Sequence, residues 1–349
     1  MISHTQKLLD FTRIKSELKK NVFSALGIYS IDHLHYLSYD EIIAEQSLMG
    51  SLIYQLDTKS FPLISSMPDI RPSIDLSLKK DSIIEPLKFL DILDFFNSLV
   101  IIKKYLNESE DHLLIELNEK MEYPENLHAR IKEVIDKEGN IKDNASPALK
   151  KIRDRLREIK FNIEVKLDSI LKNSSYDHII QEKIITIKDN RWVIPLKKNF
   201  KGKIKGLVIS TSNTGETLFL EPGVIVDDNN QYAEILGDEK KEIIKILKNL
   251  TKGVANQSEI WFKLFPVLSH FECLYAKCKY AVSTKSTKPH INQKKIWNIV
   301  QARHPLLQKP VPIDIRLGEE FQILVVTGPN TGGKNVSLKT CGLLTLKAN

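Results

Sequence analysis

Apolar residues recur three or four positions apart over most of residues 1–135, as in the stretch 87–100, with loops at 61–62 and 67–68. This spacing predicts amphipathic helices, and we expect a helical core domain over residues 1–145. No cluster of acids, histidines or nucleophiles stands out in it, so we interpret this part as structural.

A long helix is predicted to begin at Ser146-Pro147, because serine is a favoured N-cap and proline is tolerated at the first helical position. Its apolar residues share one helical face. They are Leu149, Ile152, Leu156, Ile159, Ile163, Leu167 and Ile170. We expect the helix to end near Lys172, after about 26 residues and about 39 Å.

Short β-branched or aromatic runs follow at 184–187, 192–194, 207–209 and 217–220, separated by glycine- and asparagine-containing turns. This pattern predicts a small antiparallel sheet at about 183–220, which we call the β clamp.

Helical patterning resumes at Pro222, and apolar residues alternate four and three positions apart from Ile243 to Tyr275, with one polar interruption at Gln257. A period of 3.5 predicts a coiled-coil seam, for which the helix 147–172 is the expected partner. Pro266 is expected to kink or divide the second helix. Residues 146–285 are thus predicted to form two lever helices that carry the β clamp at their far end.

The charge of the chain is concentrated at this clamp. The whole sequence carries +7, whereas residues 181–206 alone hold eight cations and two acids, a net of +6. Lysines on glycine-containing turns suit the backbone phosphates of nucleic acid, which attract cations without regard to base identity. A solvated lysine-rich loop that keeps the sheet soluble is the alternative. The candidate DNA-binding residues are Lys197, Lys198, Lys201, Lys203 and Lys205.

Composition narrows the class of protein. Hydrophobic residues make up 42% and charged residues 27% of 349, which is typical of a folded protein of two or three domains. Cys273, Cys278 and Cys341 include no C-x-x-C pair, so neither a disulfide framework nor a zinc site is indicated. Since we find neither a signal peptide nor a membrane-spanning segment, we expect a cytoplasmic protein without a membrane partner.

A phosphate-binding loop is predicted near residue 330. The run 321–326 has the pattern of a buried strand, and it leads directly into the spacing G-x-x-x-x-G-K and a helix-like segment. In such a loop backbone N–H groups surround the β-phosphate, the helix N-terminus adds its dipole, and Lys334 reaches the β- and γ-oxygens. The candidate ATP-binding residues are Gly328, Pro329, Asn330, Thr331, Gly332, Gly333, Lys334 and Asn335.

Asn335 departs from the usual pattern, in which a Ser or Thr after the lysine offers its hydroxyl to Mg²⁺. An amide oxygen can ligate Mg²⁺, so Asn335 is the candidate metal ligand, but Mg²⁺ tolerates poor octahedral geometry badly. We therefore expect phosphate binding to survive better than hydrolysis. The acidic strand that a P-loop ATPase needs does not occur before Asn349, so no catalytic residue is assigned.

At 327–334 the sequence resembles the MutS family, and the resemblance covers nearly the whole chain, most strongly from about residue 139. The segment 301–307 is similar to the opening of the family's ATPase domain. The segments 191–197, 205–208 and 215–222 resemble the lever and clamp region of the second bacterial branch. That branch lacks the mismatch-reading N-terminal domains, is associated with suppression of recombination, and usually ends in an Smr-type nuclease domain.

The resemblance implies a homodimeric ATPase, using ATP and Mg²⁺, whose two arms close around DNA. Gly328 to Asn335 would then bind the ATP phosphates. His304 would lie near the adenine, or it is a buried core or helix-capping histidine. Because the acidic strand, the dimer-signature segment and the Smr domain are not found before Asn349, we expect an N-terminal fragment of a longer protein.

The expected function is that of an ATP-dependent DNA clamp acting on branched or mismatched DNA in recombination suppression or mismatch repair. A ribosome-associated ATPase acting on stalled or collided ribosomes remains an alternative, because phosphate contacts distinguish RNA from DNA only poorly. An inert pseudo-ATPase is another. The expected fold is mainly α with a small antiparallel β clamp, followed over 294–349 by the truncated start of a P-loop α/β domain.

Overall fold

The computed structural model describes residues 2–64, 67–328 and 333–348. Packing divides the chain into two compact units, and each is built from separated stretches of sequence. The first unit comprises Met1–Pro72, Asp91–Glu125 and Asn256–Asn349, and the second comprises Ser73–Leu90 and Asn126–Ala255. The division into the predicted domains 1–145, 146–285 and 294–349 stays a prediction.

Helices fill the N-terminal third, as the apolar spacing predicts. They are α1 (Ile2–Leu8), α2 (Phe11–Lys19), α3 (Ala25–Asp32), α4 (Tyr39–Thr58), α5 (Arg71–Ser77), α6 (Pro86–Asn107), α7 (His112–Glu119) and α8 (Glu125–Val134). Local sequence sets several of their starts. The Ser24 hydroxyl caps α3, and Ser38 with Glu41 forms a capping box at the start of α4.

In the first unit α11 (Ser258–Ser283) packs against α2, α3 and α4. The carboxylate of Glu272, on α11, has no exposed surface and accepts hydrogen bonds from the backbone N–H groups of Phe23 and Ser24 and from the Ser24 hydroxyl. Burial raises the pKa of Glu272. A Cβ at Gly27 would lie 2.4 Å from the Glu272 carboxylate, so the close approach of α3 to α11 requires glycine there.

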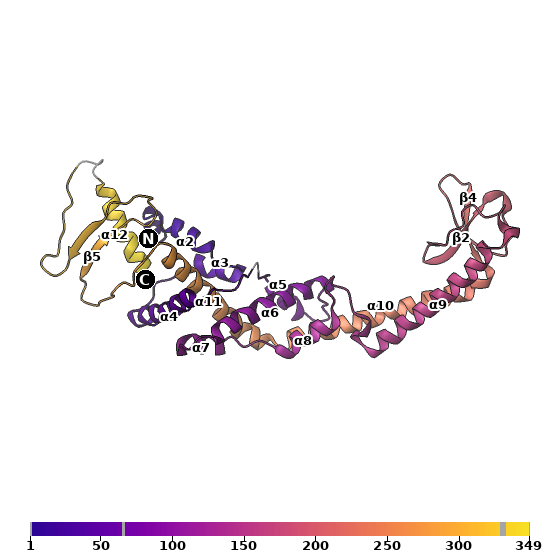
Figure 1. The fold of residues 1–349 in the computed structure, drawn as a ribbon, viewed down its shortest axis with the longest axis horizontal. Helices are drawn as coiled ribbons and strands as arrows, with labels where there is room; N and C mark the ends of the chain where they lie inside the picture. The colour runs from indigo at the N-terminus through magenta and orange to yellow at the C-terminus, as the bar shows by residue number, and fades with distance from the viewer. Residues whose placement is uncertain (1, 65–66, 329–332, 349) are drawn as a thin grey trace. The chain divides into compact units, whose positions relative to one another are not determined.

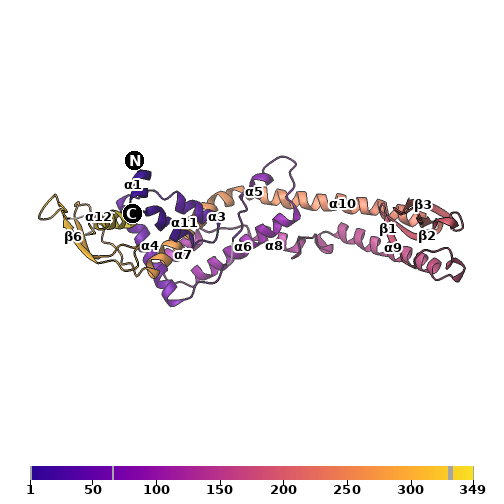
Figure 2. The ribbon, with the colours of Figure 1, turned by 90° about the horizontal axis from the view of Figure 1, so that it is seen from above.

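In the second unit α9 (Pro147–Leu171) begins where predicted, and its Leu149 N–H donates to the Ser146 hydroxyl at 3.0 Å. Helix α10 (Val226–Ala255) runs alongside α9, with the small sheet at one end of the pair (Figures 1 and 2). The apolar face of α9 is buried as predicted, against the sheet and α10. Of the predicted face, Leu156, Ile159, Ile163 and Leu167 lie in this core, Ile152 and Ile170 are half-buried against it, and Leu171, which was not predicted, is buried with them.

The prediction of one helix over 243–275, divided or kinked at Pro266, is wrong about the place of the division. The break falls between Ala255 and Ser258, where Gln257 takes a non-helical conformation, while Pro266 lies inside α11. Proline cannot donate to the carbonyl of Phe262, four residues earlier. That carbonyl needs another hydrogen-bond partner, and the Phe262 side chain is 69% exposed. Helix α10 packs along α9.

The predicted β clamp is confirmed as a four-stranded antiparallel sheet. Its strands are β1 (Thr186–Lys188), β2 (Arg191–Lys197), β3 (Gly206–Thr211) and β4 (Thr217–Pro222), in the order β1-β2-β4-β3. Asp189 and Asn190 both have positive φ, 48° and 59°, which suits a tight two-residue hairpin between β1 and β2. Alternation along β2 turns Trp192, Ile194 and Leu196 into the core with α9.

Near the C-terminus β5 (Trp297–Ala302) pairs with β6 (Ile313–Leu317), and α12 (Lys334–Ala348) follows. The prediction of a buried strand at 321–326 is wrong, because these residues form no strand and Ile323 and Val325 are 79% and 76% exposed. A central strand needs neighbours to complete its hydrogen-bond ladder, and no strand within the described ranges pairs with this segment. None of the described helices is both long and apolar enough for a membrane span.

Candidate functional site

The connection between β2 and β3 carries the predicted DNA-binding lysines. Lys198, Lys201, Lys203 and Lys205 are exposed, and none of them forms an ion pair in the described part of the chain. Lys197 is half-buried, and its Nζ donates to the carbonyl of His178 at 3.2 Å.

The lysine loop, as we call residues 197–205, is ordered by its own sequence. Ile204 is buried in the core shared by the sheet and α9, which anchors the loop near its C-terminal end. Gly202 has a φ of 85°, a backbone conformation that favours glycine. Four ammonium groups therefore extend into water from one anchored loop.

Part of the predicted net charge of +6 is already neutralised. Lys183 pairs with Asp177 at 2.7 Å, and Arg191 pairs with Glu221. Lys188 lies 4.6 Å from the centre of the Phe219 ring, in a cation–π contact. Two of the eight cations are therefore paired with carboxylates, while Lys188 keeps its charge, and the lysine loop holds five of the six that remain.

The pairing of Arg191 is part of a buried network that sequence reasoning missed. Arg191 donates from Nε and Nη2 to the two oxygens of Glu221, at 2.6 and 2.7 Å, and these bonds raise the pKa of Arg191. Asn229 donates to the same carboxylate at 2.8 Å. Nothing in the spacing pairs residues 191 and 221, and the one sequence signal was a Glu inside an otherwise apolar strand.

The structure describes four of the eight residues of the predicted phosphate loop. Pro329, Asn330, Thr331 and Gly332 lie outside the described residues. Gly328 and Gly333 have φ of 140° and 80°, values that favour glycine. Lys334 is the first residue of α12 and half-buried, and Asn335 beside it is exposed. Lys334 and Asn335 thus lie at a helix N-terminus, where an anion would be stabilised. ATP binding by this segment stays a prediction.

Helix α12 is held on the first unit. Leu343 is buried with residues of α2 and α11, and the Nζ of Lys339 donates to the Asp10 carboxylate at 2.8 Å. His304 is buried nearby, and its Nδ1 accepts a hydrogen bond from the Leu306 N–H. Burial lowers the pKa of His304, although the Asp10 carboxylate opposes the shift. The role of His304 at the adenine stays a prediction.

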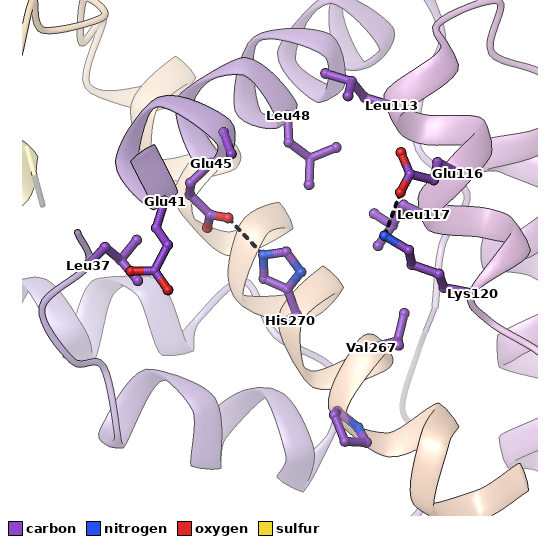
Figure 3. Close-up of a pocket in the computed structure, with 12 residues that line it drawn as sticks. Leu37, Glu41, Glu45, Leu48, Leu113, Glu116, Leu117, Lys120, Val267 and His270 are labelled. Carbon is purple, nitrogen blue, oxygen red and sulfur yellow. Dashed lines mark hydrogen bonds and ion pairs between the residues drawn. The ribbon is translucent and has the colours of Figure 1, made fainter. Parts of the chain in front are cut away.

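A groove of about 510 Å³ lies among α4, α7 and α11 (Figure 3). Its wall is largely apolar, with Leu48, Leu113 and Val267 among its residues, and it contains none of the sequence-predicted site residues. At its edge the Glu45 carboxylate accepts hydrogen bonds from His270 Nε2 at 2.8 Å and from Lys277 at 3.0 Å.

The ionisation of Glu45 is set by these two partners. Burial alone would raise the pKa of Glu45, but the hydrogen bond from His270 and the charge of Lys277 outweigh it and lower the pKa to about 2. Glu45 is therefore a charged link between α4 and α11. No group of three or more potential metal-ligating His, Cys, Asp or Glu side chains occurs within the ranges that the structure covers.

No model of a known protein family matches the chain. Curated proteins named endonuclease MutS2 match it over its whole length. That of Finegoldia magna is 37% identical and that of Caldanaerobacter subterraneus 36% identical over all of this chain, and that of a Geobacillus species is 35% identical over 99%. The matched region is 44–45% of each relative, so the chain spans less than half of their length. These matches confirm the resemblance that the motifs indicate.

Proposed function

We propose, for a chain that belongs to the MutS2-type branch of the MutS family, that its lysine loop binds the phosphate backbone of DNA. The observation that carries the proposal is the set of four exposed lysines, Lys198, Lys201, Lys203 and Lys205, on one anchored loop. Lysines are point charges, and phosphate contacts position a protein on a duplex without reading its sequence. The names of the relatives, which describe endonucleases, support DNA as the polyanion.

The wider proposal is an ATP-dependent clamp. In it α9 and α10 act as a coiled-coil lever behind the β clamp, and two copies close their arms around branched or mismatched DNA. The support for the lever is the packing of α10 along α9 within one compact unit. The nuclease named in the relatives is not assigned to these residues, since the chain matches only 45% of the first relative's length.

The proposed ATP site comprises residues 328–335. Lys334 and Asn335 in the first turn of α12 fit a triphosphate, because a helix N-terminus presents free N–H groups and a positive dipole end. Lys334 would neutralise phosphate oxygens, and Asn335 would offer its amide oxygen to Mg²⁺. The bound nucleotide would supply the energy difference between open and closed arms.

The test is the salt dependence of DNA binding. Replacing Lys197, Lys198, Lys201, Lys203 and Lys205 by Gln is expected to reduce the slope of log K against log salt by about 4, since each phosphate contact contributes about 0.9. A matched control replaces Lys240, Lys241, Lys245, Lys248 and Lys252, all exposed on α10, which changes the net charge equally. An unchanged slope in the first variant, or an equal fall in the control, contradicts the proposal.

The ribosome alternative would use the same loop, because RNA offers the same phosphates. Binding to branched duplex DNA and co-sedimentation with ribosomes, compared at equal salt, separate the two. We expect tighter binding to the DNA, and preferential co-sedimentation with ribosomes would transfer the proposal to RNA.

A further inference from the structure

The carboxylate of Glu221 lies where β2, β4 and the first turn of α10 meet. It has no exposed surface, and it accepts two hydrogen bonds from Arg191 of β2 and one from Asn229 of α10. A buried carboxylate is costly unless it is paired and hydrogen-bonded. Three elements thus contribute one side chain each to a single polar junction.

Asn229 extends this junction to the backbone of β2. Its Oδ1 accepts from the Trp192 N–H at 3.0 Å, and its Nδ2 donates to the Trp192 carbonyl at 3.1 Å as well as to Glu221. Asn229 is itself fully buried. Because these bonds are directional, they fix both the height and the rotation of α10 against the strand, which apolar packing alone tolerates more freely.

Arg191 has few N–H donors left with which to bind a nucleic acid. Its Nε and Nη2 are both engaged by Glu221, and Nη2 also donates to Asn230 Oδ1 at 2.8 Å. Arginine is otherwise the commonest side chain for reading a base. The lysine loop starts at Lys197, the last residue of β2, so any rotation of the sheet on α10 redirects all the lysines together.

We propose that Arg191 is a positioning residue: through Glu221 and Asn229 it locks the β clamp onto α10 and so fixes the direction in which the lysine loop faces. The inference rests on the proposed DNA binding by that loop. For the change in DNA affinity when Glu221 loses its charge, the proposal predicts the opposite sign to simple electrostatics. Removing the negative charge of Glu221 should strengthen binding to a polyanion if only charge mattered, and it should weaken binding if Glu221 holds the lysines in place.

The experiment measures duplex DNA affinity at fixed salt for the wild type, Glu221→Gln, Arg191→Gln and the control Asp227→Asn, which removes the same negative charge from an exposed residue in the first turn of α10. We expect Glu221→Gln and Arg191→Gln to bind about tenfold more weakly, equivalent to losing one charge-assisted contact, and the control to bind within about twofold of the wild type. Should Glu221→Gln fail to fold by circular dichroism, Arg191→Lys, which keeps the charge but loses the fork of donors, replaces it.

A second measurement reports orientation without DNA. Spin labels are placed at Asn213→Cys in the turn after β3 and at Lys245→Cys on α10, both exposed positions, and the three native cysteines are buried. The wild type should give one narrow distance distribution, and Glu221→Gln a broad or shifted one. Unchanged distances together with equal or tighter DNA binding in Glu221→Gln overturn the proposal. If the wild type binds no DNA, the proposed function fails, while the distances still decide whether Arg191 positions the sheet.

Discussion

The β clamp and the segment before α12 have similar sequence patterns but different structures. Both contain short β-branched runs beside glycine turns. The clamp strands find one another within about 40 residues and cover the apolar face of α9. The run 321–326 finds no partner strand among the described residues, and Ile323 and Val325 stay exposed.

This difference shows what a local pattern can specify. A run of apolar, β-branched residues favours a strand. The strand forms only where another strand supplies backbone hydrogen bonds and another element covers its apolar face. In the β clamp the partner strands and the helix that covers them all lie within residues 147–235. A parallel central strand instead depends on partner strands that are far away in sequence.

The largest expected effect tests burial in the two regions directly. Ile163 is fully buried under the clamp, so Ile163→Ala should lower the free energy of unfolding by about 3 kcal/mol. The matched substitution Ile323→Ala, at a residue that is 79% exposed, should change it by less than about 0.5 kcal/mol. Urea unfolding followed by circular dichroism measures both, and an equal cost at Ile323 would mean that the segment is packed after all.

A comparable effect tests α11, the helix on which α12 is held. Glu45→Gln should destabilise the first unit by about 3 kcal/mol at pH 7, because the half-buried Lys277 loses its carboxylate partner. The pKa of Glu45 is lowered from 4.5 to about 2, so its contribution is complete above about pH 4.5 and is lost as the pH falls toward 2.

Urea titrations of the wild type and Glu45→Gln at pH 7, 4 and 3 measure this contribution. The difference between the two proteins should shrink steadily with acidification. A difference that is independent of pH would show that Glu45 acts through packing alone.

The smallest effect concerns the exposed pair between Lys339 and Asp10 at the side of α12. Hydrogen bonding from Lys339 lowers the pKa of Asp10. Because the pair is solvent-accessible, Lys339→Met should cost about 0.5 kcal/mol or less, and 0.5 M NaCl should remove the difference. A loss above about 2 kcal/mol would mean that this ion pair, rather than burial of Leu343, holds the helix.

Much of the second unit follows from its sequence. Ser146-Pro147 sets the start of α9, the spacing of its apolar residues sets the buried face, and turn residues such as Asp189-Asn190 separate the clamp strands. These features are local. The break after Ala255 could not be predicted from the sequence, because Pro266 is the stronger helix breaker by itself and yet lies inside α11.

The cations of the candidate site could be predicted from the sequence, but not which of them are paired with carboxylates of the protein itself. Residues 181–206 contain eight cations. The sequence does not show that Arg191 forms an ion pair with Glu221, because that pair depends on the register of β2 against β4. Asn229 gives no sequence signal, since one asparagine in the first turn of a helix is ordinary. The hydrogen-bond partners of Arg191 are set only when β2, β4 and α10 pack together.

The interleaving of the two units has a consequence for the order in which they form during synthesis. All of the second unit, Ser73–Leu90 and Asn126–Ala255, has been made once residue 255 leaves the ribosome. The first unit needs α11, from Ser258 onward, to cover α2, α3 and α4. The sides of those early helices that face α11 therefore stay uncovered until α11 has been made, after all residues of the second unit.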